Sequence, residues 1–135
     1  MENPRLLASA RSAACECRSV IAAKLGAAHV DAVDLDAQAL EATAANARGN
    51  DVQVRVAAAE SLPPARYDIV VSNILAQPLL LLAPLLASRT AQRGRIALSG
   101  ILESQAAEVA RAYAGRFTIT VSAEEGWALL EGAPR

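Results

Sequence analysis

Aromatic residues are scarce in this chain of 135 residues and make up only 3% of it. Apolar residues nevertheless account for 53% of the sequence. A core must therefore be built from aliphatic side chains and alanine, as it is in parallel sheets that helices cover. We expect a single domain over residues 1–135, because a chain of this length can bury roughly two thirds of its unfolded surface.

An excess of either charge is also absent. The 13 basic and 14 acidic residues leave a net charge of −1, which gives no electrostatic reason to expect nucleic acid or an anionic membrane as the main partner. Long hydrophobic runs are missing too. The longest, residues 78–87, contains Pro84 and is far shorter than the roughly 20 residues of a membrane-spanning helix.

Cysteine is limited to Cys15 and Cys17, which are too close in sequence for an unstrained disulfide. With His29 as the only histidine, they are too few for a zinc site, and we expect no metal. Because Arg11 and Glu16 interrupt any signal-peptide core, we expect a cytoplasmic protein with reduced thiols.

Strand and helix patterns alternate along the chain, apart from an atypical start over residues 1–20. The order predicts an α/β fold with a Rossmann-like sheet, mostly parallel and closed by an antiparallel hairpin at its C-terminal edge. Strands are expected at 29–35, 52–56, 67–72, 95–99, 116–122 and 127–130, and helices at 12–25, 37–48, 77–90 and 103–114. Gly26 should end the first helix, and Asp36 should be the N-cap of the second.

Two polar residues end apolar strands and are the candidate ligands. Asp34 follows residues 30–33, where a carboxylate can accept hydrogen bonds from both ribose hydroxyls of a nucleoside cofactor. Asn73 follows residues 67–72, and its amide can orient a carboxylate or an incoming amine. The competing interpretation of Asn73 is a cap for the following helix, and Asp36 has the same competing role.

Other conspicuous residues have structural interpretations. Gly94, Gly100 and Gly126 lie at strand boundaries and are predicted to be turn residues. Trp127 is expected to have a packing role, and residues 124–125 to form a solvated turn. The sequence shows no catalytic triad and no evident general base, so the catalytic residues are unknown at this stage.

Taken together, these segments make the chain resemble the bacterial ribosomal protein L-eleven methyltransferases, a class I family that depends on S-adenosylmethionine. The match covers residues 20–131. The motifs that carry it are Ala22-Ala23-Lys24-Leu25-Gly26, Val33-Asp34-Leu35-Asp36, Asn73-Ile74-Leu75, Leu82-Ala83-Pro84, Leu98-Ser99-Gly100-Ile101-Leu102 and Glu125-Gly126-Trp127.

The resemblance implies that Asp34 holds the cofactor ribose and that Asn73 lies against the methionine end, near the transferred methyl group. It implies S-adenosylmethionine as the cofactor and a large-subunit ribosomal protein as the partner, methylated on its amino groups. The family also carries an N-terminal substrate-recognition domain, to which no segment of this chain corresponds.

The family pattern also places an aspartate and three glycines at positions 10, 12, 14 and 16. Here these positions are Ala10, Ser12, Ala14 and Glu16. One hypothesis is a truncated or frame-disrupted gene, and the functional alternative is a non-enzymatic remnant or interaction module that keeps the fold. A nicotinamide-dependent oxidoreductase would also use an acid like Asp34, but the glycine fingerprint of that class is missing.

The start of the chain has a further consequence for the sheet. If residues 5–10 do not supply the central strand, strands 29–35 and 67–72 are left with unpaired edges. Such edges, together with the apolar run of residues 79–82, would favour self-association.

Overall fold

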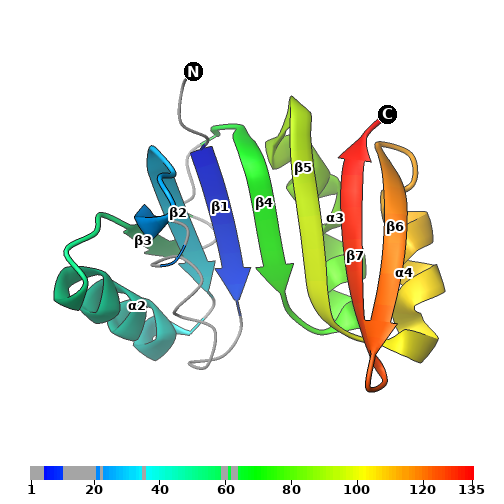
Figure 1. Ribbon diagram of the computed structural model, residues 1–135, viewed down its shortest axis with the longest axis horizontal. Coiled ribbons are helices and arrows are strands. Elements are labelled where there is room, and N and C mark those ends of the chain that lie inside the picture. The colour runs from blue at the N-terminus through cyan, green and yellow to red at the C-terminus, as the bar shows by residue number, and fades with distance from the viewer. Residues whose placement is uncertain (1–4, 11–20, 22, 35, 59–60, 62–63) are drawn as a thin grey trace.

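A seven-stranded sheet is the centre of the computed structural model (Figure 1). The structure describes residues 5–10, 21, 23–34, 36–58, 61 and 64–135. Along the sheet the strand order is β3-β2-β1-β4-β5-β7-β6. The strands are β1 (Arg5–Ala10), β2 (His29–Asp34), β3 (Arg55–Ala58), β4 (Tyr67–Asn73), β5 (Thr90–Leu102), β6 (Phe117–Glu124) and β7 (Trp127–Pro134).

Strands β1 to β5 pair in parallel, and β7 pairs antiparallel with both β5 and β6. This confirms the predicted parallel sheet with an antiparallel hairpin at its C-terminal edge. The β6–β7 turn also matches its prediction, because Glu125 and Gly126 have φ angles of 51° and 83°, the left-handed pair that a two-residue hairpin loop requires.

The first strand of the sheet is supplied by residues 5–10. β1 lies between β2 and β4, with Leu6 paired to Val30 on one side and to Ile69 on the other. The unpaired edges considered for β2 and β4 therefore do not arise. A short stretch with a weak pattern can serve as a central strand because strong neighbours on both sides supply its ladder hydrogen bonds.

The helices cover the sheet from opposite faces. Helix α2 (Ala37–Gly49) joins β2 to β3, and α3 (Ala76–Arg89) joins β4 to β5. These two crossovers run in opposite directions along the sheet, so right-handed connections place the helices on opposite faces. Figure 1 shows α3 and α4 (Ala106–Tyr113) behind the strands. No helix in the described part of the chain has the length and apolar character needed to cross a membrane.

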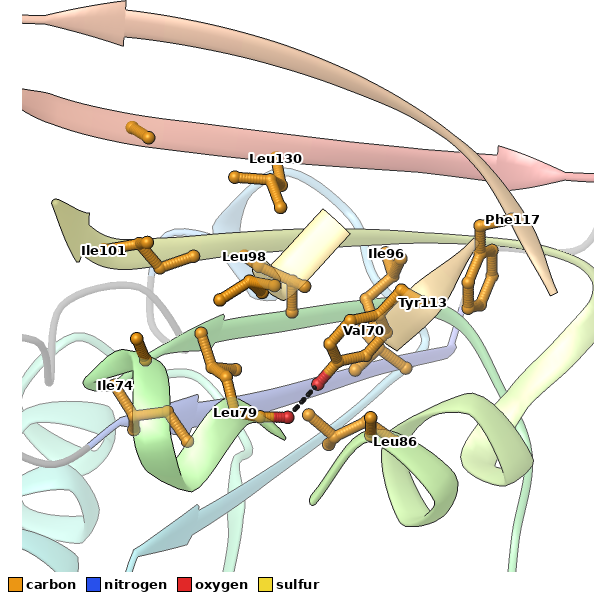
Figure 2. Packing of buried hydrophobic residues seen from close by; sticks show 14 of the residues in the cluster. Val70, Ile74, Leu79, Leu86, Ile96, Leu98, Ile101, Tyr113, Phe117 and Leu130 are labelled. Atoms are coloured by element: carbon orange, nitrogen blue, oxygen red, sulfur yellow. Dashed lines mark hydrogen bonds between the residues drawn. The ribbon is translucent and has the colours of Figure 1, made fainter. Parts of the chain in front are cut away.

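The main core lies between the sheet and helices α3 and α4 (Figure 2). Aliphatic side chains form most of it, as the composition predicts, and Leu79, Leu98, Ile101 and Leu130 are fully buried. The Tyr113 hydroxyl donates a hydrogen bond to the Leu79 carbonyl oxygen at 2.7 Å. The bond joins α4 to α3 and gives the buried phenol the partner that it needs.

Several element boundaries differ from the sequence-based prediction. β5 runs from Thr90 to Leu102 and includes Gly94 and Gly100, so the prediction that these glycines are turns outside a strand was wrong. In β4, Tyr67 pairs with Thr90 while Ile69 already pairs with Arg95, so residues 91–94 bulge opposite a single residue. A second irregularity separates Leu98 from Ile101. Bulges let a strand continue through glycines that would otherwise end it.

The sequence predicts the bounds of the other helices and strands approximately. β3 begins at Arg55 rather than at residue 52, and the helix expected at 103–114 starts as a 3₁₀ turn, Glu103–Gln105, before α4. Most of the helix expected at 12–25 lies outside the described residues. Its end is seen, because Lys24 is helical and Gly26 follows with φ of 102°, which confirms the predicted glycine stop.

Candidate functional site

The strand order reverses between β1 and β4, since β1 leads toward β2 and β3 whereas β4 leads toward β5. In open α/β sheets, ligands bind beside such a point, outside the carboxyl ends of the strands. Three strands end there at one level, beside Ser99 of β5, which continues to Leu102. Ala10 of β1 pairs with Asn73 of β4, Asn73 pairs with Ser99 of β5, and Asp34 ends β2 next to β1.

Both sequence-predicted ligands lie on one face of this edge. Ile69 and Val71 pack with Val30 on the face opposite α3 and α4. Side chains alternate along a strand, so Asp34 and Asn73 continue that same face. One strand lies between β2 and β4, which separates the two residues by two strand spacings, roughly 10 Å. The site can therefore contact an extended ligand at two points.

Asp34 is 8% exposed and is held by the chain that follows it. Its Oδ1 accepts a hydrogen bond from the backbone N–H of Asp36 at 2.9 Å. Within the described residues, Oδ2 accepts none. The carboxylate is thus fixed through one oxygen and offers the other to a ligand.

Asp36 has the structural role that the sequence predicts. Its side chain accepts a hydrogen bond from the Gln38 N–H at 2.9 Å and caps α2. The two acids are two residues apart, yet Asp34 is buried at the strand end whereas Asp36 is exposed on the helix.

Asn73 is held by two residues that sequence analysis did not assign to the site. The Ser99 hydroxyl donates a hydrogen bond to Asn73 Oδ1 at 3.0 Å. Gly100 has φ of 83°, and a Cβ atom there would lie 2.8 Å from Asn73 Oδ1 and 2.8 Å from the Ile74 carbonyl oxygen. Glycine is therefore needed both for backbone conformation and for space. The Ser-Gly pair at the end of a strand was the available signal.

A second polar cluster lies away from this edge and has a structural role. Arg55 donates two hydrogen bonds of 2.8 Å to the Asp31 carboxylate, and the Tyr67 hydroxyl donates a third at 2.5 Å. Burial, together with the hydrogen bond to Asp31, raises the pKa of Tyr67 to about 12. Asp31 is buried, and these donors satisfy it as a buried carboxylate requires.

Other predicted features have mixed outcomes. Trp127, interpreted from the sequence as a packing residue, is 54% exposed, because the alternation of β7 buries Ala128 and Leu130 instead. Positions 12, 14 and 16 of the glycine motif, Cys15 and Cys17 lie outside the described residues. The described residues hold no group of three or more His, Cys, Asp or Glu side chains able to bind a metal ion.

Comparison with known proteins identifies the family. A model of the ribosomal protein L11 methyltransferase family matches residues 17–134. The chain belongs to this family. It is 48% identical over 115 residues to the ribosomal protein L11 methyltransferase of Cupriavidus pinatubonensis, and 44% identical over 118 residues to that of Neisseria meningitidis.

The alignments cover most of this chain but less than half of each relative. These alignments cover 84% and 87% of this chain but only 39% and 40% of the two relatives. The chain therefore spans about two fifths of the length of the curated L11 methyltransferases that it matches.

Solved structures confirm the fold. The ribosomal protein L11 methylase of Lactobacillus delbrueckii subsp. bulgaricus superposes with a TM-score of 0.86 and 26% identity, over 100% of this chain and 72% of that one. A 16S rRNA methyltransferase of T. thermophilus, in complex with S-adenosylmethionine and guanosine, gives 0.77 at 15% identity, over 100% of this chain and 38% of that one. The second likeness concerns the fold alone.

Family membership implies S-adenosylmethionine as the cofactor, and the described residues fit it chemically. Asp34 has a carboxylate oxygen without a described partner, which suits a ribose hydroxyl. Gly100 lets the β5 backbone approach Asn73 so closely that a Cβ atom would lie 2.8 Å from Asn73 Oδ1. Both features lie at the edge where ligands of such sheets bind.

Proposed function

We propose that this chain binds S-adenosylmethionine at the carboxyl edge of its sheet and transfers methyl groups to amino groups of ribosomal protein L11. The observation that carries the proposal is that Asp34 and Asn73 lie on the same face of the sheet beside the switch point. The relatives named as L11 methyltransferases support the substrate.

Asp34 and Asn73 have separate tasks in this proposal. Asp34 accepts hydrogen bonds from the ribose hydroxyls, which fixes the nucleoside end of the cofactor. Asn73, held by Ser99 and spaced by Gly100, orients the methionine end. The cofactor supplies an electrophilic methyl group, so the residues of the chain contribute mainly by positioning the reacting groups. No general base is assigned.

Methyl transfer can be tested by intact-mass spectrometry of ribosomal protein L11 incubated with the chain and S-adenosylmethionine. Added mass corresponding to one or more methyl groups is the expected result. Asp34→Asn should reduce it strongly, because the amide keeps an acceptor for the Asp36 N–H but loses the second carboxylate oxygen. Asp36→Asn is the matched control, with the same charge change at the exposed cap.

The two alternatives give different results in this assay. Unmodified L11, together with a folded chain that fails to bind the cofactor product S-adenosylhomocysteine, would refute the enzymatic proposal and favour the non-enzymatic module. Unmodified L11 with S-adenosylhomocysteine bound would refute methyl transfer to this substrate and leave the cofactor site standing.

A further inference from the structure

The β6–β7 turn lies at the same edge of the sheet as the candidate site. Figure 1 shows this turn at the lower edge, where the arrows of β1 and β4 also end. Leu102, at the end of β5, pairs with Trp127 at the start of β7. The Glu103 N–H donates a 2.8 Å hydrogen bond to the Gly126 carbonyl oxygen, so the turn is attached to the end of β5.

Large apolar side chains are exposed around this turn. Trp127 is 54% exposed, Leu102 45% and Leu129 38%. Trp127 and Leu129 alternate with Ala128 and Leu130, which are buried in the core beneath α4. Trp127 and Leu129 therefore point to the opposite face of the sheet, which is the face that carries Asn73. Exposed aromatic and aliphatic groups that gather in one place mark interaction sites.

Trp127 and Leu129 border a hollow of about 370 Å³ that acidic groups also line. Ser122, Glu124, Glu125, Trp127 and Leu129 are among its lining residues. Glu103, the residue that follows β5, is exposed beside the turn. None of these three carboxylates makes an ion pair with a described residue.

Basic residues of this part of the sheet gather at its other edge. Arg95 lies in the first half of β5, Arg116 precedes β6 and Arg135 follows β7. Arg116 is engaged there, since its guanidinium donates hydrogen bonds to the carbonyl oxygens of Thr90 and Ala91. The turn end is consequently acidic and attracts cations, and it repels the phosphates of a nucleic acid.

We propose that Leu102, Glu103, Glu124, Glu125, Trp127 and Leu129, the acidic-aromatic patch, dock a lysine-bearing segment of a protein substrate. The indole face of Trp127 binds the ammonium group by a cation–π contact, and the carboxylates complement its charge. The apolar side chains contact the lysine stem. That the docked segment belongs to the methylated protein rests on the proposed function.

The distance between the patch and Asn73 determines which residues of the segment can occupy the two places. β5 lies between β4 and β7, and Leu102 is three residues beyond Ser99 along it. These offsets give roughly 10–15 Å between Asn73 and the patch. An extended peptide covers that length in about four residues. The docked lysine and the methylated amine therefore belong to different residues of one segment.

The chain contains a single tryptophan, Trp127, so intrinsic fluorescence reports on the patch directly. The purified chain is titrated, without cofactor, with a capped peptide of alternating glycine and lysine. The same peptide with every lysine acetylated is the matched ligand. We expect a saturable change in Trp127 emission with the first peptide, weakened by added salt, and none with the second.

Variants separate the patch from general charge effects. Glu124→Gln combined with Glu125→Gln should weaken the lysine peptide about fivefold, as expected for two exposed charge contacts. Glu131→Gln, a change of the same kind on β7 but outside the patch, should leave the affinity unaltered. Calorimetry on Trp127→Ala should show loss of binding while circular dichroism shows the chain to be folded.

Equal response to the lysine and acetyl-lysine peptides would overturn the proposal. An emission change that depends on protein concentration alone would also overturn it, because the occupant would then be a second copy of the chain. Peptide binding is measured without cofactor. Titration of the same variants with S-adenosylhomocysteine therefore keeps a failure of the patch distinct from a failure of the proposed function.

Discussion

Replacing Gly100 by alanine tests the packing that holds Asn73. Gly100 has φ of 83°, and its Cβ would lie 2.8 Å from both Asn73 Oδ1 and the Ile74 carbonyl oxygen. The left-handed conformation costs a non-glycine residue about 1–2 kcal/mol. Relieving the overlap adds about 1–3 kcal/mol, as overpacking does elsewhere. We expect the free energy of unfolding to fall by about 3 kcal/mol and the affinity for S-adenosylhomocysteine to fall with it.

Gly126→Ala is the matched control for this substitution. Gly126 has the same φ of 83°, but nothing lies within 4 Å of the position its Cβ would take. It should therefore show the conformational cost alone, about 1–2 kcal/mol, with cofactor affinity unchanged. Urea denaturation followed by circular dichroism gives the stabilities, and calorimetry gives the affinities. Equal losses in both variants, with equal affinities, would refute the argument that Gly100 positions Asn73.

Three further predictions follow from hydrogen bonds in the structure. Ser99→Ala removes the donor to Asn73 Oδ1 and should lower the affinity for S-adenosylhomocysteine roughly fivefold in calorimetry. Ser99→Thr keeps the hydroxyl and should retain the affinity. Equal losses in the two variants would contradict the positioning role of Ser99. Tyr67→Phe leaves the buried Asp31 carboxylate one donor short and should cost about 1–3 kcal/mol of unfolding free energy in urea, so an unchanged midpoint would contradict it. The pKa of Tyr67 is raised to about 12 from an ordinary value of about 10, so the contribution of Tyr67 to stability is full below pH 10 and is lost as the pH rises toward 12. Urea midpoints measured between pH 10 and pH 12 should therefore fall more steeply for the native chain than for Tyr67→Phe. Parallel curves for the two proteins would contradict this.

Local signals were enough to predict much of the fold from the sequence. The N-cap at Asp36, the glycine stop at Gly26 and the turn at Glu125-Gly126 are local signals, and all three are confirmed. The strand ending at Asp34 and the strand ending at Asn73 were also found, since apolar runs that end on a polar residue are visible without any tertiary information.

What the sequence could not predict depends on residues far apart in the chain. The Ser99 hydrogen bond to Asn73 and the crowding at Gly100 arise only when β4 and β5 pair in their observed register. Gly94 and Gly100 were taken as strand ends because a glycine inside a strand usually weakens it, and the bulges that accommodate them are tertiary features. The exposure of Trp127 depends on which face of β7 meets α4, which the sequence alone does not fix.

The central claim is that the Asp34 side of the switch point binds the cofactor. Calorimetric titration of the folded chain with S-adenosylhomocysteine, repeated on Asp34→Asn and Asp36→Asn, tests it most directly. The account predicts micromolar binding to the native chain and to Asp36→Asn, and a large loss in Asp34→Asn. No binding to the folded native chain, or equal binding to all three proteins, would contradict the claim.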